Sequence, residues 1–402
     1  MKYHLCTACL YVLPIVYSHA VALEQSHQSV SAFLQENNYA EITLLYLEPN
    51  VSGQVQYQQQ LRERGVTDFS TGDLVESKHF INAGLKLQLS PQLSFGLLFD
   101  QPFGGRVNYQ YTPEIYAEKI EIESSHIQFD SRNMTALIGY QPTPRWNFFT
   151  GISWQDFKGY LEVFGQDYAV FNGYSVAFER DSALGWLTGF SYQIPEYAFK
   201  TAVTYRAKIK HRLNTYEHTQ HTLLNLVPEN QSVVETPQSV NAHLQTAIST
   251  HNLVYADLRW VNWSDFSIQP PQFNAVIAAY APYVPEISGY QLISYPKDQW
   301  SAKIGWAHRW TPTWVSFIES SWDSGTGNTV STLNPSDGFS SFGTGVVYRV
   351  NQKNEITFGA HYLKFRKAKI NTNTDSAVSF ASLATSNNNN ALVYGLRLAH
   401  RF

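Results

Sequence analysis

The sequence has 402 residues, of which 15% are aromatic and only 15% are charged, and its formal net charge is −4. Soluble chains carry about 25% charged residues, so this chain is short of ionic surface. Its slightly negative mean hydropathy excludes a helical membrane protein, and its net charge argues against a nucleic-acid partner. An aromatic-rich, charge-poor composition is typical of a membrane β-barrel.

Residues 1–22 are predicted to be a secretory signal peptide. A basic residue precedes the apolar run Leu10–Tyr17, and the small residues Ala20–Ala22 follow it. Cleavage after Ala22 makes Leu23 the first residue of the mature chain. Both cysteines fall before that point, so we expect a mature chain with no disulfide and no reactive thiol.

Residues 23–40 precede the first predicted strand. They contain a small apolar patch around Phe33 and Leu34, followed by Asn37-Asn38-Tyr39. Three interpretations are open: a disordered tail, a short helix, or a plug inserted into a barrel. Because apolar side chains are driven out of water, we favour the plug.

Residues 41–402 are predicted to form one all-β domain, a transmembrane antiparallel β-barrel. Six short, turn-rich connections each lie between two stretches of alternating apolar and polar residues, which indicates β-hairpins. Longer polar connections separate the hairpins. This alternation of short turns and long loops is typical of outer-membrane barrels and predicts fourteen strands, with both termini on the periplasmic side. The predicted strands span 41–58, 76–90, 92–102, 120–141, 145–160, 174–193, 197–213, 231–249, 252–267, 294–310, 313–323, 338–350, 354–370 and 390–402.

The final stretch, Ala391–Phe402, alternates with period two. Leu392, Leu396 and Leu398 fall on one face, and Arg397 falls on the other. Such a strand must cover both its edge and its apolar face, either in a soluble sandwich or in a barrel closed within a bilayer. The pattern of turns and loops favours the barrel, in which this strand pairs with the first one.

Five basic residues are predicted to face the lumen, because a charge on the lipid face costs about 2–4 kcal/mol at the bilayer midplane. They are Arg206, Lys208, Arg259, Lys303 and Arg397. Two interpretations are open. These cations bind a substrate carboxylate through charge-assisted hydrogen bonds, or they pair with inward acids such as Asp257 and fill a polar interior.

The third predicted strand runs into Gln101-Pro102-Phe103-Gly104-Gly105. Proline removes a ladder donor, and paired glycines favour a bulge or kink. The stretch is therefore either an ordinary strand end or a lateral opening in the barrel wall. Elsewhere the sequence has no G-x-S-x-G, H-E-x-x-H or Walker motif, so we predict no catalytic residues, no cofactor and no metal site.

Five stretches carry a family resemblance: Glu41–Gly53, Phe99–Gly105, Thr201–Lys210, Thr236–Ser239 and Trp260–Phe266. Together they resemble the long-chain fatty acid transporter (FadL) family of outer-membrane proteins. The most specific match is T-A-V-T-Y-R-A-K-I-K, the sequence of Thr201–Lys210.

The resemblance implies a barrel of the bacterial outer membrane that takes up long-chain fatty acids or other hydrophobic compounds passively. In such proteins an N-terminal hatch plugs the lumen, and a kink in the third strand lets the cargo leave sideways into membrane lipid. We expect a monomeric barrel whose lateral gate consists of Gln101, Pro102, Gly104 and Gly105. The expected substrate-binding residues are Phe33, Leu34, Tyr39, Phe103, Arg206, Lys208, Arg259 and Arg397.

The chain departs from the family at its hatch. Only residues 23–40 precede the first strand, and Asn37-Asn38-Tyr39-Ala40 stands where the family has Asn-Pro-Ala. A shortened hatch leaves two other functions open. One is a general aqueous pore or binding barrel for small polar solutes, and the other is a barrel enzyme that acts on lipid.

Overall fold

A computed structural model describes most of the chain after the predicted signal peptide. The peptide itself, residues 1–22, lies outside the described residues, as do parts of several long connections. The described residues are 23–55, 58–63, 65, 67, 69–109, 124–219, 222–223, 225–327, 329–331, 333–371, 384–386 and 389–402.

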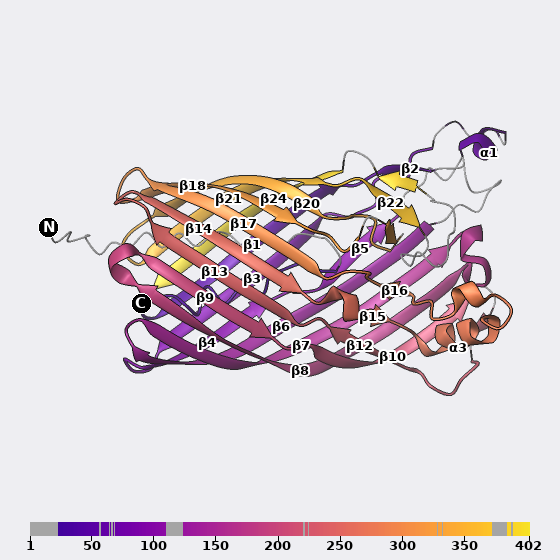
Figure 1. Ribbon diagram of the computed structural model, residues 1–402, viewed down its shortest axis with the longest axis horizontal. Helices are drawn as coiled ribbons and strands as arrows, with labels where there is room; N and C mark the ends of the chain where they lie inside the picture. Colours follow the sequence, from indigo (N-terminus) through magenta and orange to yellow (C-terminus); the bar gives the residue numbers. More distant parts are fainter. Residues whose placement is uncertain are drawn as a thin grey trace.

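Antiparallel strands close into a single barrel of fourteen strands, as predicted (Figure 1). Three of the fourteen are interrupted once, so each has two labels. In chain order the strands are β1 (Tyr39–Asn50), β3 (Lys78–Gln88), β4 (Leu93–Asp100) with β5 (Gly104–Asn108), β6 (Ser124–Thr143), β7 (Trp146–Phe164), β8 (Tyr174–Ile194), β9 (Phe199–Arg206) with β10 (Ile209–Thr219), β12 (Gln231–Thr236) with β13 (Ser239–Ala247), β14 (Asn252–Val261), β17 (Gln299–Arg309), β18 (Trp314–Asp323), β20 (Phe339–Arg349), β21 (Asn354–Phe365) and β24 (Asn390–Arg401).

The barrel closes between its first and last strands. β1 pairs with β24 along its whole length, with Tyr46 opposite Tyr394. Leu396 and Leu398 are exposed on the outer surface, whereas Arg397 is buried on the lumen side. The predicted pairing and the predicted two faces of the last strand are both confirmed.

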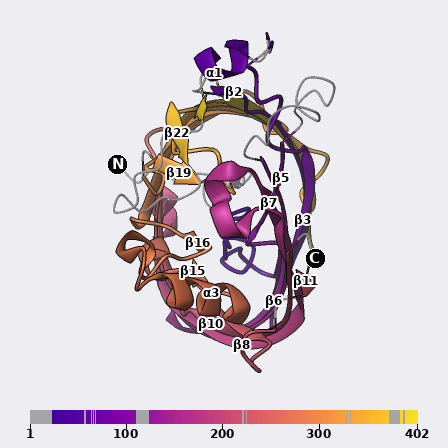
Figure 2. The same cartoon turned by 90° about the vertical axis from the view of Figure 1, so that its right-hand side faces the viewer.

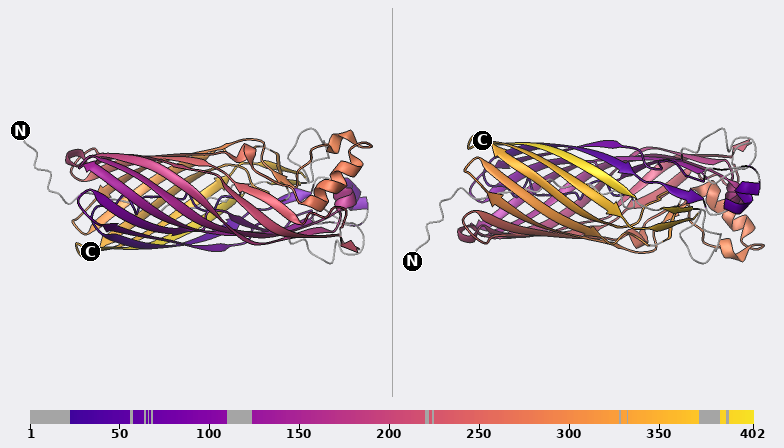
Figure 3. Two further views of the ribbon diagram at one scale, coloured as in Figure 1. Left: turned by 90° about the horizontal axis from the view of Figure 1, so that it is seen from below. Right: turned by 90° about the horizontal axis from the view of Figure 1, so that it is seen from above.

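The two ends of the barrel differ. Short turns and the C-terminus lie at one end, and the long connections gather at the other (Figures 1 and 3). In outer-membrane barrels the end with short turns is periplasmic. No described helix is long and apolar enough to cross a membrane. The elements of the long connections are β2 (Gly53–Val55), α1 (Gln58–Glu63), η1 (Gln166–Phe171), β11 (Thr222–Leu223), η3 (Trp263–Asp265), β15 (Ser267–Ile268), α3 (Pro271–Tyr280), η4 (Pro285–Ile287), β16 (Ile293–Ser294), β19 (Thr329–Ser331), β22 (Ala368–Asn371) and β23 (Ala384–Ser386), while η2 (Pro195–Tyr197) forms a short turn.

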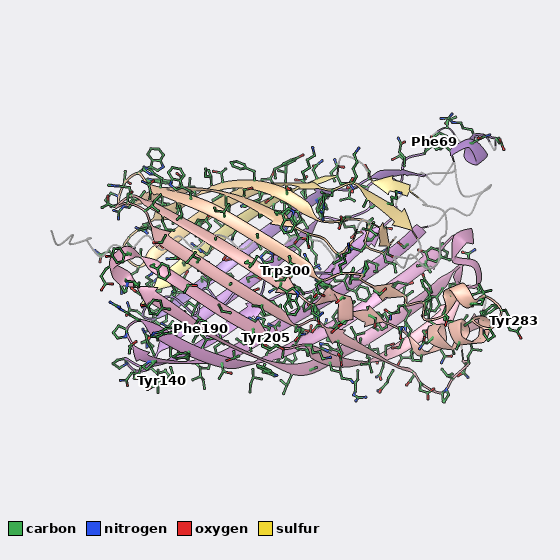
Figure 4. All side chains as sticks on the ribbon, in the orientation of Figure 1. Phe69, Tyr140, Phe190, Tyr205, Tyr283 and Trp300 are labelled. Atoms are coloured by element: carbon green, nitrogen blue, oxygen red, sulfur yellow. The ribbon has the colours of Figure 1, made fainter. Side chains whose placement is uncertain are left out.

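The outer surface of the barrel carries large apolar side chains, as a lipid-facing wall requires. Tyr205 and Trp300 project from the middle of the wall, and Tyr140 and Phe190 lie toward the end with short turns (Figure 4). Trp263 differs from these outer aromatic residues, because its side chain is fully buried. The chain leaves the wall after β14 and turns inward at η3, which carries Trp263 into the interior.

The N-terminal segment, Leu23–Asn38, lies inside the barrel. Phe33 is fully buried and packs edge-to-face against Phe149 of β7, with ring centroids 5.6 Å apart. A Cβ at Gly96 would lie 2.4 Å from the Phe33 ring. The glycine in β4 therefore makes room for this aromatic anchor, which holds the segment against the wall.

Candidate functional site

Two buried arginines of the wall bind the backbone of the N-terminal segment. Arg206 donates from Nη2 to the Gln28 carbonyl oxygen at 3.0 Å and from Nε to the same oxygen at 3.3 Å. Arg259 donates from Nη1 to the His27 carbonyl oxygen at 3.2 Å and forms a salt bridge with Glu24. Both arginines face the lumen as predicted, and both hold the segment in place.

Two lysines that the sequence analysis did not single out do the same at the far end of the segment. Lys86 of β3 donates to the carbonyl oxygen of Gln35, and Lys200 of β9 donates to that of Leu34. Carbonyl groups at the end of a helical turn lack backbone partners and carry partial negative charge. The alternation of apolar and polar residues in each strand places both lysines on the lumen face, and this pattern could have identified them.

Lys208 was predicted to face the lumen, and that prediction is wrong. Its side chain is more than half exposed and lies 2.6 Å from Glu235 Oε2 on the outer surface. Arg206 and Ile209 are both buried on the inside, so the alternation is broken between β9 and β10. The residue inserted there turns Lys208 outward.

Arg397 and Tyr39 flank the periplasmic part of the lumen. Arg397 is buried, and its Nη2 donates to Thr357 Oγ1 at 3.0 Å. It also lines a cavity between the N-terminal segment and strands β1, β3 and β4. Tyr39 is buried at the start of β1 and donates to Glu41 Oε2 at 2.6 Å. Leu34 lines a second cavity on the opposite side of the segment.

The wall is interrupted at the predicted kink. The β3–β4 ladder stops where Ala83 faces Phe99, and residues 78–82 of β3 have no ladder partner among the described residues of β4 and β5. β4 pairs with β6 up to Asp100, and β5 resumes at Gly104 one residue out of register. Residues 101–103 thus form a bulge in which Pro102 cannot donate a hydrogen bond. We call this interruption, between residues 78–82 and 101–105, the β3–β4 break.

Side chains close the β3–β4 break in place of the missing backbone pairs. Gln101 Oε1 accepts a hydrogen bond from the Ile81 backbone nitrogen at 3.0 Å. Lys78 Nζ lies 2.9 Å from Asp130 Oδ1 and 3.1 Å from Gln25 Oε1. Side-chain contacts of this kind open without disturbing the neighbouring ladders, because each ladder keeps its own backbone bonds.

The N-terminal segment pairs directly with the break. The Gln25 nitrogen donates to the Pro102 carbonyl oxygen at 2.7 Å, and the Gly104 nitrogen donates to the Leu23 carbonyl oxygen at 2.7 Å. A Cβ at Gly104 would lie 2.5 Å from the Phe129 carbonyl oxygen. Gly104 is therefore needed for this close approach, and Gly105 continues the pairing with β6.

An apolar cavity lies above the break, toward the long connections. Phe103 is buried and meets Trp263 edge-to-face, with ring centroids 5.9 Å apart. Leu23 lies in the same apolar cluster. A small cavity opens beside these residues, and its apolar lining consists of Leu23, Ile127, Ile293, Tyr295, Pro296, Val330 and Leu333. Figure 2 shows α3, β15 and β16 beside the mouth of the barrel at this end.

Comparisons with known proteins agree with this architecture. Residues 31–402 match the family described as outer membrane protein transport protein (OMPP1/FadL/TodX). A sequence search of curated proteins found no match.

Solved structures share the fold at low sequence identity. The chain is similar to a Pseudomonas aeruginosa FadL homologue, with a TM-score of 0.64, 13% identity, and 92% of each chain covered. It is also similar to the Pseudomonas putida toluene transporter TodX, with a TM-score of 0.59, 12% identity, and 92% of this chain and 91% of that chain covered. The Ralstonia pickettii toluene transporter TbuX gives a TM-score of 0.58 at 12% identity, with the same two coverages. This chain belongs to the OMPP1/FadL/TodX family of outer-membrane transport proteins.

Proposed function

We propose that this protein is a passive, single-barrel channel for small hydrophobic molecules that leave through the β3–β4 break into the lipid of the outer membrane. The observation that carries the proposal is that the upper cavity and the β3–β4 break are continuous through Phe103. Phe103 belongs both to the apolar cluster beside the upper cavity and to the bulge of the break. A molecule that moves from the cavity past Phe103 reaches lipid without crossing water, which favours apolar cargo.

The lining of the upper cavity supports neutral hydrocarbons ahead of fatty acids. None of the described residues that line it is charged. The arginines that were candidates for a carboxylate, Arg206 and Arg259, bind the N-terminal segment instead. Two of the solved structures named above are of toluene transporters, and that cargo class is compatible with an uncharged cavity.

We further propose that residues 23–40 act as a plug and that residues 41–402 form the channel wall. Four wall cations, on β3, β9 and β14, hold the backbone or the acid of this segment, which supports a fixed rather than a trailing position. A second candidate function, an aqueous pore, has one observation in its favour. The cavity beside Leu34 has polar lining residues that include Lys200, Asn241 and His243. Large, steady single-channel currents would support the pore, and near-silence would support the plugged channel.

A reversible lock tests lateral release. Ile81 and Gln101 occupy facing positions across the break, and residues 23–402 contain no cysteine. The double variant Ile81→Cys with Gln101→Cys forms a disulfide under oxidation and opens again under reduction. We expect the oxidised form to take up ethylbenzene more slowly than the reduced form in whole cells.

The matched control uses the same two strands. Leu85 and Leu97 are register partners in the intact β3–β4 ladder, so the variant Leu85→Cys with Leu97→Cys locks strands that are already paired. Its uptake should not respond to oxidation. Equal uptake by the oxidised and reduced forms of the Ile81/Gln101 variant would overturn release through this break.

A further inference from the structure

The wall contains a second interruption, between β8 and β10. Ladder pairs join these strands where Phe178 faces Thr215, and β8 pairs with β9 where Leu187 faces Arg206. Between these points all residues are described, yet no ladder pair joins residues 179–185 to residues 208–214. We call this interval the β8–β10 break.

An extra residue in each strand explains the lost pairing. Phe178 and Leu187 are both buried on the lumen side, although strict alternation would place them on opposite faces. In the facing strands β9 and β10, Arg206 and Ile209 are likewise both buried on the lumen side, where strict alternation would place them on opposite faces. In β8 the extra residue lies at Glu179 and Arg180, which are adjacent and both exposed, near one end of the break. In the facing strands it lies between β9 and β10, near the other end. Between the two irregularities the strands are out of phase by one residue, so a ladder cannot form.

Side chains fill the β8–β10 break as they fill the β3–β4 break. Asp181 Oδ2 accepts a hydrogen bond from the Arg212 backbone nitrogen at 3.1 Å and lies 3.2 Å from His211 Nδ1. Glu179 Oε2 accepts from Asn214 Nδ2 at 3.1 Å. Unpaired strand backbone is costly within a membrane, where no water replaces the missing partner. Each break has the same substitute, a side-chain oxygen that accepts from an unpaired backbone nitrogen.

The two breaks lie at the same level of the barrel, on either side of β6, β7 and β8. Asp100, at the first break, faces Asn133 of β6. The neighbouring Arg132 faces Asp156 of β7, which in turn faces Ser182 within the second break. A molecule held near the centre of the lumen at this level is therefore placed to approach either break.

A small cavity lies at the end of the β8–β10 break where β9 passes into β10. Gln28 of the N-terminal segment and Phe103 of the first break line its inner side. Trp186 also lines it, and this side chain is half exposed on the outer surface, where its ring lies 5.3 Å from that of Tyr205. Figure 4 shows Tyr205 on the outer wall. The cavity thus borders a wall residue that faces lipid, and the buried Arg206 lines it as well.

The cavity also contains a free hydrogen-bond donor. Gln155 is fully buried and lines it, and its Oε1 accepts from Thr236 Oγ1 at 2.9 Å and lies 3.1 Å from His211 Nε2. Its Nε2 has no partner among the described residues. A buried amide nitrogen left unpaired is costly, and a ligand oxygen that accepts its hydrogen bond would remove that cost.

We propose that the β8–β10 break is a second lateral passage, and that its cavity binds small, neutral hydrophobic molecules that carry one hydrogen-bond acceptor. The proposal rests on hydrophobic cargo as stated above, but not on release through the β3–β4 break. The apolar body of the ligand lies between Phe103 and Trp186, and its oxygen accepts from Gln155 Nε2. Acetophenone fits this description, and ethylbenzene has a similar shape without the acceptor.

A second reversible lock tests the passage. Glu179 and Asn214 face each other across the β8–β10 break with their side chains in contact, so the variant Glu179→Cys with Asn214→Cys should form a disulfide. We expect oxidation to slow acetophenone uptake more than ethylbenzene uptake. The control, Ser175→Cys with His218→Cys, locks register partners in the intact β8–β10 ladder and should respond to neither.

The two locks separate the two proposals. If the Ile81/Gln101 lock alone abolishes uptake of both compounds, the second passage is overturned while release through the β3–β4 break stands. If only the Glu179/Asn214 lock slows uptake, the second passage stands and release through the first break fails. The reduced form of each variant, tested for heat-resistant migration on gels, shows whether the barrel has assembled.

A variant of the donor tests the cavity without a disulfide. Gln155→Met keeps the length of the side chain and removes Nε2, so acetophenone should bind about fivefold more weakly, the usual effect of one neutral hydrogen bond. Ethylbenzene binding should not change. Equal acetophenone affinity in Gln155→Met and the unchanged protein would overturn the assigned ligand class, even if the locks could not be formed.

Discussion

Lys78 Nζ lies 2.9 Å from Asp130 Oδ1, and this ion pair spans the β3–β4 break. The two residues belong to β3 and β6, which do not pair with each other at this level. Gln25 of the N-terminal segment accepts a hydrogen bond from the same lysine. One cation therefore joins both edges of the break to the segment in the lumen.

Removing this lysine should open the break. In Lys78→Met the contacts to Asp130 and Gln25 are lost, and ethylbenzene uptake should rise by up to about tenfold, because a charge-assisted hydrogen bond contributes about 1.5 kcal/mol. A more exposed ion pair, Arg145 with Glu196, lies away from the break at the periplasmic turns, so Arg145→Met is the control. Unchanged uptake in Lys78→Met would show that the ion pair does not limit passage.

Releasing the N-terminal segment should turn the channel into a pore. Arg259→Met removes the salt bridge to Glu24, and breaking a buried pair in this way costs about 3–5 kcal/mol because the remaining charge is left unpaired. Single-channel conductance should then increase. Lys208→Met removes an exposed cation from the same wall and should leave the conductance as it was.

Acid should loosen the same segment through His27. Partial burial, with Arg259 and Lys303 nearby, lowers the pKa of the His27 imidazole from 6.5 to about 3. The released segment takes up a proton near pH 6.5 and the docked segment does not, so docking is at full strength above that pH and weakens as the pH falls toward 3. The docking equilibrium should change by up to about tenfold per pH unit in this window.

Conductance measured between pH 7.5 and 4.5 checks this pH dependence. The currents of the unchanged protein should rise as the pH falls, and those of His27→Asn should stay flat. An equal rise in both proteins would assign the effect to another group.

Filling the upper cavity should block entry. Ile293 lines this cavity, so Ile293→Trp should lower ethylbenzene uptake, at a cost in stability of about 1–3 kcal/mol from overpacking. Ile304 is exposed on the lipid face of β17, and Ile304→Trp adds the same volume outside the lumen. Equal uptake by the two variants would remove the cavity from the route.

The sequence predicts the wall of this protein better than its interior. Alternation and turn residues predict the fourteen strands and the two faces of the last strand, because each strand has one lipid face and one lumen face. The alternation predicts the wrong face for Lys208, because an inserted residue between β9 and β10 reverses which side chains face the lumen. The amino-acid composition does not reveal this insertion.

Contacts inside the lumen depend on how strands far apart in the chain are placed. Trp263 belongs to a recognisable sequence stretch, but its inward turn follows from the geometry of η3. Lys200 and Leu34 lie 166 positions apart, and nothing local in the sequence pairs them. For the same reason the β8–β10 break could not be predicted, because it arises where an extra residue in each of two facing strands puts them out of phase.

Crystals soaked in iodobenzene test lateral release most directly, because the anomalous signal of iodine locates the ligand along its route. Release through the wall predicts iodine in the cavity beside Leu23 and Phe103 and again at the β3–β4 break, near Gln101 and Pro102. Iodine found only along the barrel axis, between the N-terminal segment and β13, would contradict lateral release and show that the cargo passes into the periplasm.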